Sequence, residues 1–316
     1  MSHLYSFASL GGIECGAFRL RGVGLANCLF PWARCAVASK RYGLERIAST
    51  WPQLCHRQWL RWDRDKRCYF GLFDEGVGVI RGPRKLGLLA AKPRINERDF
   101  LAGPPKYDDG VVVFSGIDGY FQDLLGEYED VRRMLIAATR PEHKRALDRD
   151  AAPEIFVHVR YGDAVPADTP QGRALKIRYH LRQPMSWFIH VVNELRRQVG
   201  TYVPVRVFSD ASDAELASLL ALPDVTRMSF GSSIADLLAL STAKVLVASG
   251  STFSMWASYL GRMPVIWPAG QRRQSLHGPA WEYEIELDHD PLPDLVAGLI
   301  RQRLSSVPAA YSEARL

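Results

Sequence analysis

The sequence predicts an α/β protein with two domains and a parallel sheet in the second of them. The chain has 316 residues, which is enough for two domains with separate cores. In the second half, apolar runs rich in β-branched residues alternate with helical stretches, a pattern typical of a parallel sheet with helices on both faces. The first half opens in a related way, with a glycine-rich turn that leads into an amphipathic helix.

In the first half, the glycine-rich turn covers residues 22–27, and the helix is expected from about Cys28 to Arg41. Such a turn can bind an anion through the free N–H groups of the helix start, or it can carry glycine for geometry alone. Residues 82–106 are rich in glycine, proline and charge, so we expect long loops there.

The segment from Thr139 to Pro153 is polar and helix-like, and we expect it to end the first domain. The domains are therefore predicted as residues 1–150 and 151–316. In the second domain, strands are expected at 155–159, 203–208, 244–248 and 264–267, and helices at 184–198, 212–221, 233–241 and 293–304.

The composition is that of a soluble globular protein, with 47% hydrophobic and 23% charged residues. No apolar stretch reaches the roughly 18 residues of a membrane span, and the N-terminus lacks the pattern of a secretion signal. The five cysteines form no CxxC pair, and the neighbours Cys55 and His56 have no spacing typical of zinc ligands. We therefore expect a cytoplasmic protein with reduced thiols and no metal.

All of the formal net charge of +6 comes from residues 1–150, which hold 24 Lys and Arg against 18 Asp and Glu. Basic and aromatic side chains alternate in one stretch: Arg57, Trp59, Arg61, Trp62, Arg64, Lys66, Arg67 and Tyr69. This stretch is compatible with an anionic membrane surface, an anionic acceptor or a solvated basic face. Asp63 and Asp65 interrupt it and no recognition motif accompanies it, so we expect no nucleic-acid partner.

The most informative motif is His158-Val159-Arg160-Tyr161-Gly162-Asp163, at the end of a predicted strand. Open α/β sheets bind ligands at the carboxyl ends of their strands. The guanidinium of Arg160 is always charged and offers a planar fork of donors, which suits a diphosphate. His158 leaves the strand on the same side as Arg160. Gly162 would allow a tight turn, and Asp163 would orient Arg160 or cap a helix.

Two further strand ends carry polar side chains. Asp210, in Val207-Phe208-Ser209-Asp210, accepts hydrogen bonds from a nucleobase or caps a helix, and Ser212 with Glu215 fits a capping box just after it. The strand at 244–248 is followed by Ser249-Gly250-Ser251-Thr252-Phe253-Ser254. Hydroxyl groups at a helix start suit a phosphate, and capping by one serine is the alternative.

These motifs, in this order, resemble those of the α-1,2-fucosyltransferases of glycosyltransferase family 11, and more loosely those of the wider fucosyltransferase superfamily. The first half adds two matches. Gly24-Leu25-Ala26-Asn27-Cys28-Leu29-Phe30 is similar to the family's G-L-G-N-Q-hydrophobe-F opening, and Gly119-Tyr120-Phe121-Gln122 is similar to its G-Y-F-Q segment. The resemblance covers five motifs within residues 22–268.

The chain departs from the family pattern at several motif positions, which are Ala26, Cys28, Tyr161, Ala211, Gly250 and Met255. The motif residues that would bind phosphate match the family pattern better than the motif residues near an acceptor. The resemblance therefore implies a nucleotide-sugar donor more firmly than any particular acceptor.

The resemblance implies a GT-B fold, with two Rossmann-like domains facing a cleft, and inverting transfer of fucose from GDP-fucose without a metal or other cofactor. Domain 151–316 would bind the donor, and domain 1–150 would lie on the side of a glycan or glycolipid acceptor. Arg160, Ser251 and Thr252 would neutralise the departing diphosphate. The other expected site residues are His158 and Asp163 (catalytic), Gly24, Asn27, Ser209, Asp210 and Phe253 (donor), and Asp118, Tyr120 and Gln122 (acceptor side).

Several alternatives stay open at the level of sequence. The donor could be another GDP-sugar, or the chain could be a non-catalytic GDP- or glycan-binding protein that keeps the fold. An inverting displacement needs a base for the acceptor proton, and Glu14, Asp118 and Asp123 are candidates without a distinguishing context. We expect a bacterial protein of surface-polysaccharide synthesis, in peripheral contact with an anionic membrane.

Overall fold

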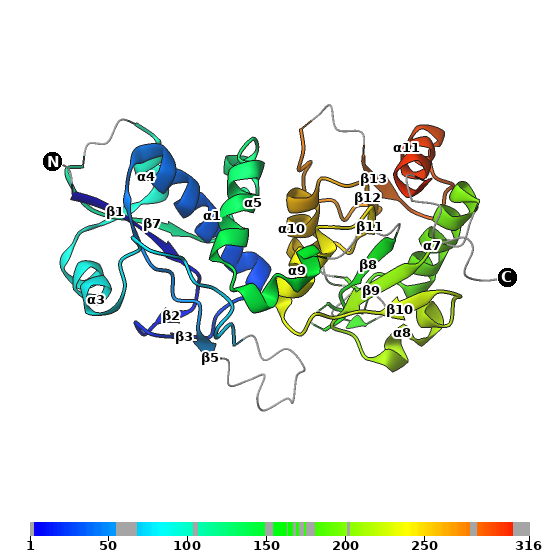
Figure 1. Ribbon diagram of the computed structural model, residues 1–316, viewed down its shortest axis with the longest axis horizontal. Coiled ribbons are helices and arrows are strands. Elements are labelled where there is room, and N and C mark those ends of the chain that lie inside the picture. Colours follow the sequence, from blue (N-terminus) through cyan, green and yellow to red (C-terminus); the bar gives the residue numbers. More distant parts are fainter. Residues whose placement is uncertain are drawn as a thin grey trace. The chain divides into compact units, whose positions relative to one another are not determined.

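The computed structural model describes residues 3–54, 68–103, 107–148, 154–162, 164–166, 169–170, 174, 181–200, 203–278 and 283–305. The chain divides into two compact units, residues 1–144 and 145–316. Each unit has helices packed around a parallel sheet (Figure 1). The boundary expected at residue 150 falls within residues 149–153, which lie outside the described ranges.

The first unit contains a four-stranded parallel sheet in the order β4-β1-β7-β6. Its strands are β1 (His3–Ser9), β4 (Glu45–Ile47), β6 (Arg94–Asn96) and β7 (Asp109–Ser115). Helices α1 (Leu25–Tyr42) and α5 (Tyr128–Ala138) pack together, with α1 against β1 and β7. The opposite face buries Tyr5 and Phe7 against leucines of α3 (Gly82–Ala91).

The helix predicted between Cys28 and Arg41 is confirmed, and it begins three residues earlier than expected. Gly24 is its N-cap residue, and the helix ends where Gly43 takes a left-handed conformation with φ 66°. Most of its residues from Leu25 to Ser39 are buried, so α1 is the central helix of this unit.

The long loops predicted over residues 82–106 are wrong. This stretch contains α3, β6 and the short helix α4 (Glu97–Leu101). Pro83 lies in the first turn of α3, where its missing N–H costs nothing, and Asn96 caps α4 by accepting from the N–H of Arg98. Proline and asparagine residues that suggested loops therefore mark the starts of helices in this stretch.

The helix-like segment after Thr139 forms 3-10 turns in its described part, namely η2 (Pro141–His143) and η3 (Arg145–Asp148). A further 3-10 turn, η1 (Gln122–Leu124), follows β7. A small three-stranded sheet, in the order β2-β3-β5, completes the unit. Its strands are β2 (Ile13–Glu14), β3 (Arg19–Leu20) and β5 (Gln53–Leu54).

The second unit contains a six-stranded, fully parallel sheet in the order β10-β9-β8-β11-β12-β13. The strands are β8 (Ile155–Val159), β9 (Val205–Ser209), β10 (Val225–Arg227), β11 (Val245–Val247), β12 (Val265–Pro268) and β13 (Glu284–Leu287). The four predicted strands correspond to β8, β9, β11 and β12 and are confirmed. The edge strands β10 and β13 were not predicted.

Helices cover both faces of this sheet, as the alternating pattern predicts (Figure 1). One face buries an apolar core with α7 (Met185–Val199), α8 (Asp213–Leu220) and α11 (Asp294–Ser305). Helices α9 (Ser233–Leu240) and α10 (Thr252–Gly261) pack together on the other side. All four helices predicted for this half are confirmed, and the capping box of Ser212 and Glu215 opens α8. Within the described ranges, no helix has the length and apolar character needed to cross a membrane.

Candidate functional site

The order of the strands in the second unit marks one position of the sheet as a ligand site. β8 is the first strand of this sheet in the chain; β9 and β10 are added on one side of it, and β11, β12 and β13 on the other. The connections therefore run in opposite directions on either side of the gap between β8 and β11. In open α/β sheets, ligands bind beyond the carboxyl ends of the strands at such a switch point.

His158, near the end of β8, forms the centre of a buried polar cluster. Its Nδ1 atom lies 2.8 Å from Oγ of Ser254, 3.1 Å from Oγ of Ser249 and 3.4 Å from Oγ of Ser251. Its ring stacks on Phe253 with centroids 5.1 Å apart. Burial, helped by the charge of Arg160, lowers the pKa of His158 to about 3. His158 is therefore neutral at physiological pH.

The serines of this cluster form the turn that leads from β11 into α10. Ser251 is the N-cap residue, and its Oγ accepts from the N–H of Ser254 at 3.2 Å. The turn is held on its other side as well, because the N–H of Gly250 donates to Oε1 of Gln271 at 3.0 Å and Arg273 donates to the carbonyl of Gly250 at 2.8 Å. The helix start is thus fixed from two directions.

The structure distinguishes the hydroxyl residues that the sequence grouped together. Ser249 and Ser251 are buried, and their hydroxyls contact His158. Thr252 and Phe253 are half-buried and open the helix. Ser251 therefore caps α10, which was the alternative to phosphate binding. The first turn of α10 comes directly after β11, one of the two strands at the switch point.

Arg160 is the first residue after β8 and is half-buried. Beyond it, the N–H of Tyr161 donates to Oδ1 of Asp210 at 2.7 Å. Gly162 has no left-handed φ, and the reason for a glycine is space: a Cβ atom there would lie 2.6 Å from Oδ2 of Asp210. Asp163 lies outside the described residues.

Asp210 connects the turns that follow β8 and β9. It is exposed and accepts from Tyr161, whereas the cap of α8 is Ser212. The suggestion that Asp210 caps a helix is therefore wrong. Oγ of Ser209 accepts from the N–H of Ala211 at 3.0 Å, which fixes the same turn from inside. The predicted donor-site residues of the second domain that the structure describes therefore all lie where β8, β9 and β11 end, at the same edge of the sheet.

The remaining predicted residues belong to the first unit. The N–H of Asn27 donates to the carbonyl of Gly24 at 3.0 Å in the opening turn of α1, and Asn27 is half-buried. Phe30, one turn further along α1, meets the rings of Tyr120 at 5.8 Å and Phe121 at 4.9 Å. The two family-like motifs of the first half therefore pack against each other.

Two acceptor-side candidates lie on the surface. Gln122 is exposed and opens η1. Asp118 pairs with Arg98 at 2.8 Å between Oδ2 and Nη2, and both side chains are largely exposed. Tyr120 has a left-handed backbone with φ 48°, which turns the chain between β7 and η1.

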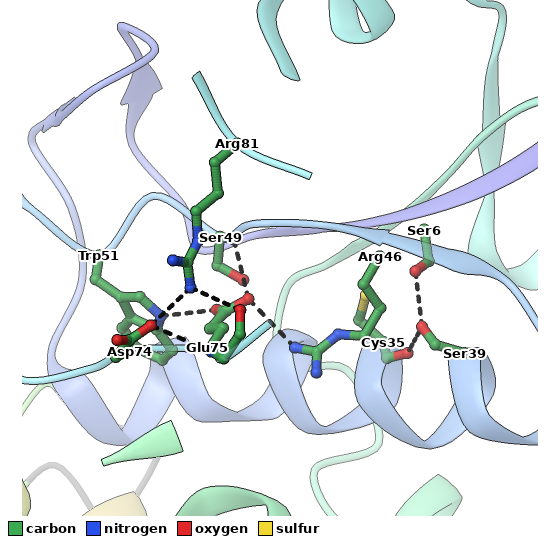
Figure 2. A network of polar contacts seen from close by, with 10 residues as sticks. Ser6, Cys35, Ser39, Arg46, Ser49, Trp51, Asp74, Glu75 and Arg81 are labelled. Atoms are coloured by element: carbon green, nitrogen blue, oxygen red, sulfur yellow. Dashed lines mark hydrogen bonds and ion pairs between the residues drawn. The ribbon is translucent and has the colours of Figure 1, made fainter. Parts of the chain in front are cut away.

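Sequence reasoning missed a set of buried polar groups in the first unit. The carboxylate of Glu75, almost fully buried, accepts from Nε1 of Trp51 at 2.9 Å, Nη2 of Arg46 at 3.3 Å and the N–H of Ser49 at 3.4 Å. Figure 2 shows these partners converging on Glu75. No signal in the sequence joins these residues, because they come from β4, the segment after it and a loop 24 to 29 residues later.

The carboxylate of Glu14, a candidate base, also has buried neighbours. Its Oε1 accepts from the hydroxyl of Thr50 and lies 3.6 Å from Nζ of Lys85. Burial lowers the pKa of Lys85, although the charge of Glu14 opposes this. Glu14 therefore contacts two buried polar side chains, whereas Asp118 is exposed and pairs only with an exposed arginine in the described contacts. The sequence around Glu14 does not indicate these contacts.

Within the described part of the chain, no three His, Cys, Asp or Glu side chains gather into a cluster that could hold a metal ion.

No protein-family model and no curated protein matches the chain. Among solved structures, the chain is similar to the fucosyltransferase NodZ from Bradyrhizobium, with 17% sequence identity and a TM-score of 0.51 over 84% of this chain and 94% of that one. It is also similar to a NodZ α-1,6-fucosyltransferase co-crystallized with GDP, with 15% identity and a TM-score of 0.50 over 84% and 95% of the two chains.

At this level of identity the similarity concerns the fold. The chain is an α/β protein with parallel sheets of the GT-B type found in these fucosyltransferases. The fold class that the sequence motifs imply is thereby confirmed.

Proposed function

We propose that the chain is a metal-independent, inverting glycosyltransferase that transfers fucose from GDP-fucose to a glycan or glycolipid. The observation that carries this proposal is the arrangement at the switch point. Arg160 follows one of the two strands that flank it, and the serine-capped start of α10 follows the other. The similarity of the fold to NodZ, one of whose structures was co-crystallized with GDP, supports the same choice of ligand.

The chemistry explains why such an arrangement suits a GDP-sugar. In the displacement, the acceptor oxygen forms a bond to the anomeric carbon while the bond from that carbon to the diphosphate oxygen breaks. The leaving diphosphate gains negative charge. The guanidinium of Arg160, the N–H groups at the start of α10 and the hydroxyl of Thr252 are donors suited to that charge.

The neutral state of His158 supports a positioning role in this proposal. A neutral ring holds the hydroxyls of Ser249 and Ser251 and stacks on Phe253 without adding a titrating charge beside Arg160. With a pKa of about 3, it is poorly suited to remove the acceptor proton. We assign His158 to orientation of the α10 turn, and Asp210 with Ser209 to the guanine.

On the acceptor side, the proposal assigns Gly24 and Asn27 to contact with the donor phosphate, and Tyr120 and Gln122 to the acceptor. Asp118, one of the three candidate bases, is engaged by Arg98 on the surface. Glu14 has the more protected environment. The motifs resemble α-1,2 enzymes, whereas the structural neighbour is named an α-1,6 enzyme, so the linkage has to be measured.

The test is calorimetric titration with GDP, GDP-fucose and UDP without added metal. We expect GDP and GDP-fucose to bind and UDP to bind weakly. Arg160→Ala should weaken GDP binding by about 10- to 150-fold, because a hydrogen bond to a charged group contributes about 1.5–3 kcal/mol. Arg197→Ala is the matched control, since this arginine is exposed on α7 and pairs with Glu194.

The outcomes separate the open functions. Absence of GDP binding overturns the proposal. GDP binding that Arg160→Ala abolishes, without hydrolysis of GDP-fucose or transfer to any glycan, identifies a non-catalytic binding protein. Equal turnover of another GDP-sugar assigns a different donor to the same site.

A further inference from the structure

The small sheet of the first unit exposes a row of apolar side chains. The register pairs Ile13 with Leu20 and Leu20 with Leu54, so these three side chains lie side by side on one face. Their exposed fractions are 57%, 36% and 38%. We refer to Ile13, Leu20 and Leu54 as the apolar row. Contiguous apolar groups on a surface mark a contact with something else more often than isolated ones do.

The opposite face of the same sheet explains why the row cannot turn inward. There the register aligns Glu14, Arg19 and Gln53, and Arg19 and Gln53 are completely buried. The guanidinium of Arg19 donates to the carbonyls of Leu10 and Gly11 at 2.7 and 2.6 Å. A slip by one residue would break these bonds, so the face with the apolar row is held outward.

The charge beside the row is positive. Arg21 follows Leu20 directly and is exposed, and no ion pair joins its side chain to another described residue. The first half of the chain is basic as a whole, since residues 1–150 hold 24 Lys and Arg against 18 Asp and Glu.

We propose that the apolar row binds the surface of an anionic lipid bilayer. Apolar side chains enter the boundary between headgroups and acyl chains, and neighbouring basic side chains add attraction to anionic lipids. Neither the apolar contact nor the charge attraction is sufficient alone, and the first unit supplies both. The inference deepens the proposed function, on which it rests for the identity of the acceptor: a lipid-linked acceptor is found at the surface that the row would bind.

A second copy of the chain fits this face less well. A stable interface needs about 800 Å² from each partner, or roughly 20 residues, and the row offers three side chains. Two copies that meet through this face would also bring their positive charges together. The charge therefore favours an anionic partner.

The test is co-sedimentation with vesicles of phosphatidylcholine alone and of phosphatidylcholine mixed with an equal amount of phosphatidylglycerol. Neither donor nor acceptor is present, so the result is independent of catalysis. The test variant is the double substitution Ile13→Ser and Leu54→Ser. The control is Leu101→Ser with Leu125→Ser, which removes two leucines of the same unit that are exposed to 41% and 43%. Thermal unfolding and circular dichroism check that both variants fold.

We expect the wild type and the control to bind the anionic vesicles and to bind neutral vesicles weakly. The double substitution in the row should weaken binding to anionic vesicles at least about tenfold, because the apolar signal is lost. Arg21→Gln should weaken it less and reduce its dependence on salt.

Three results would overturn the inference. The wild type could fail to bind either vesicle, the row variant could bind as the wild type does, or light scattering could show a wild-type dimer that the row variant dissociates. The GDP titration is unaffected by any of them. Loss of vesicle binding with intact GDP binding thus rejects the membrane surface alone, and the converse result rejects the donor site alone.

Discussion

Gly162 and Asp210, which follow the neighbouring strands β8 and β9, are packed so closely that the carboxylate leaves no space for a side chain at position 162. A Cβ atom on Gly162 would lie 2.6 Å from Oδ2 of Asp210, while Oδ1 of the same carboxylate accepts from the N–H of Tyr161 at 2.7 Å. The carboxylate therefore holds the turn after β8 and occupies the space that a side chain at position 162 would need.

Gly162→Ala should displace Asp210 and release Tyr161, and we expect a loss of about 1–3 kcal/mol in the free energy of unfolding. If the proposed guanine contact exists, GDP affinity falls as well. The measurement is urea unfolding together with GDP titration. In an Asp210→Ala background the same glycine substitution should cost much less, because the clash has been removed. Equal costs in both backgrounds would contradict the relationship.

The neutral state of His158 predicts a specific dependence of stability on pH. Its folded pKa of about 3 lies below the ordinary value of 6.5, so below pH 6.5 the unfolded chain binds the proton more readily. The stability contribution is therefore complete above the ordinary pKa and is lost progressively as the pH falls toward the folded pKa.

The test compares urea unfolding of wild type and His158→Asn at about pH 7 and about pH 5. Asn does not titrate and can still hydrogen-bond a serine hydroxyl. Between these pH values the wild type should lose about 1–2 kcal/mol more than the variant. His289→Asn, a substitution at an exposed histidine, is the control and should follow the wild type. An identical pH dependence of His158→Asn and wild type would show that His158 is not buried as described.

The second unit was largely predictable because its strands are continuous apolar runs. Strands β8 and β11 are buried along their whole length, which is what a central parallel strand requires. The strands that were missed, β10 and β13, are three and four residues long and carry exposed polar residues at the edges of the sheet. Their assignment depends on pairing with a neighbour, which a single sequence does not show.

The candidate site was predicted as a set of motifs, but its internal contacts were not. His158 and Ser254 are 96 residues apart in the chain, and only the order of the strands brings them together. The sequence therefore offered the serines as phosphate ligands, whereas in the structure Ser249, Ser251 and Ser254 surround His158. The helix α3 was missed because a proline near its start was interpreted as a loop signal.

The cysteines of the first unit should differ sharply in reactivity. Cys15 is exposed, whereas Cys35 is buried beside Ser6 and Ser39 (Figure 2), and burial raises the pKa of its thiol to about 11. Almost no thiolate forms at Cys35 near neutral pH, and thiolate is the reactive species. Iodoacetamide should modify Cys15 within minutes and leave Cys35 unmodified until the chain is denatured.

Peptide mass spectrometry distinguishes the two sites. Cys15→Ser should remove the modified peptide that contains residue 15 without exposing Cys35. Modification of Cys35 in the native protein at the same rate as Cys15 would show that the core between α1 and β1 opens freely.

The neighbouring residues Glu97 and Arg98 make two ion pairs that should differ in their contribution to stability. Glu97 binds Arg34 of α1 through two bonds of 3.0 Å, and Arg34 also donates to the carbonyl of Ser115 at 2.8 Å. The exposed fractions of the Arg34 and Glu97 side chains are 4% and 13%, whereas those of Arg98 and Asp118 are 73% and 80%.

Arg34→Ala should lower the free energy of unfolding by about 3–5 kcal/mol, because it leaves a largely buried carboxylate and a strand-end carbonyl without their donor. Arg98→Ala should cost less than about 1 kcal/mol, since water screens that pair. Urea unfolding of the two variants is the measurement. The double substitution Arg34→Met and Glu97→Leu should recover much of the loss, because it removes the stranded charge and keeps the apolar volume. If Arg34→Ala and Arg98→Ala cost the same, Arg34 does not join α1 to the end of β7 in the way described.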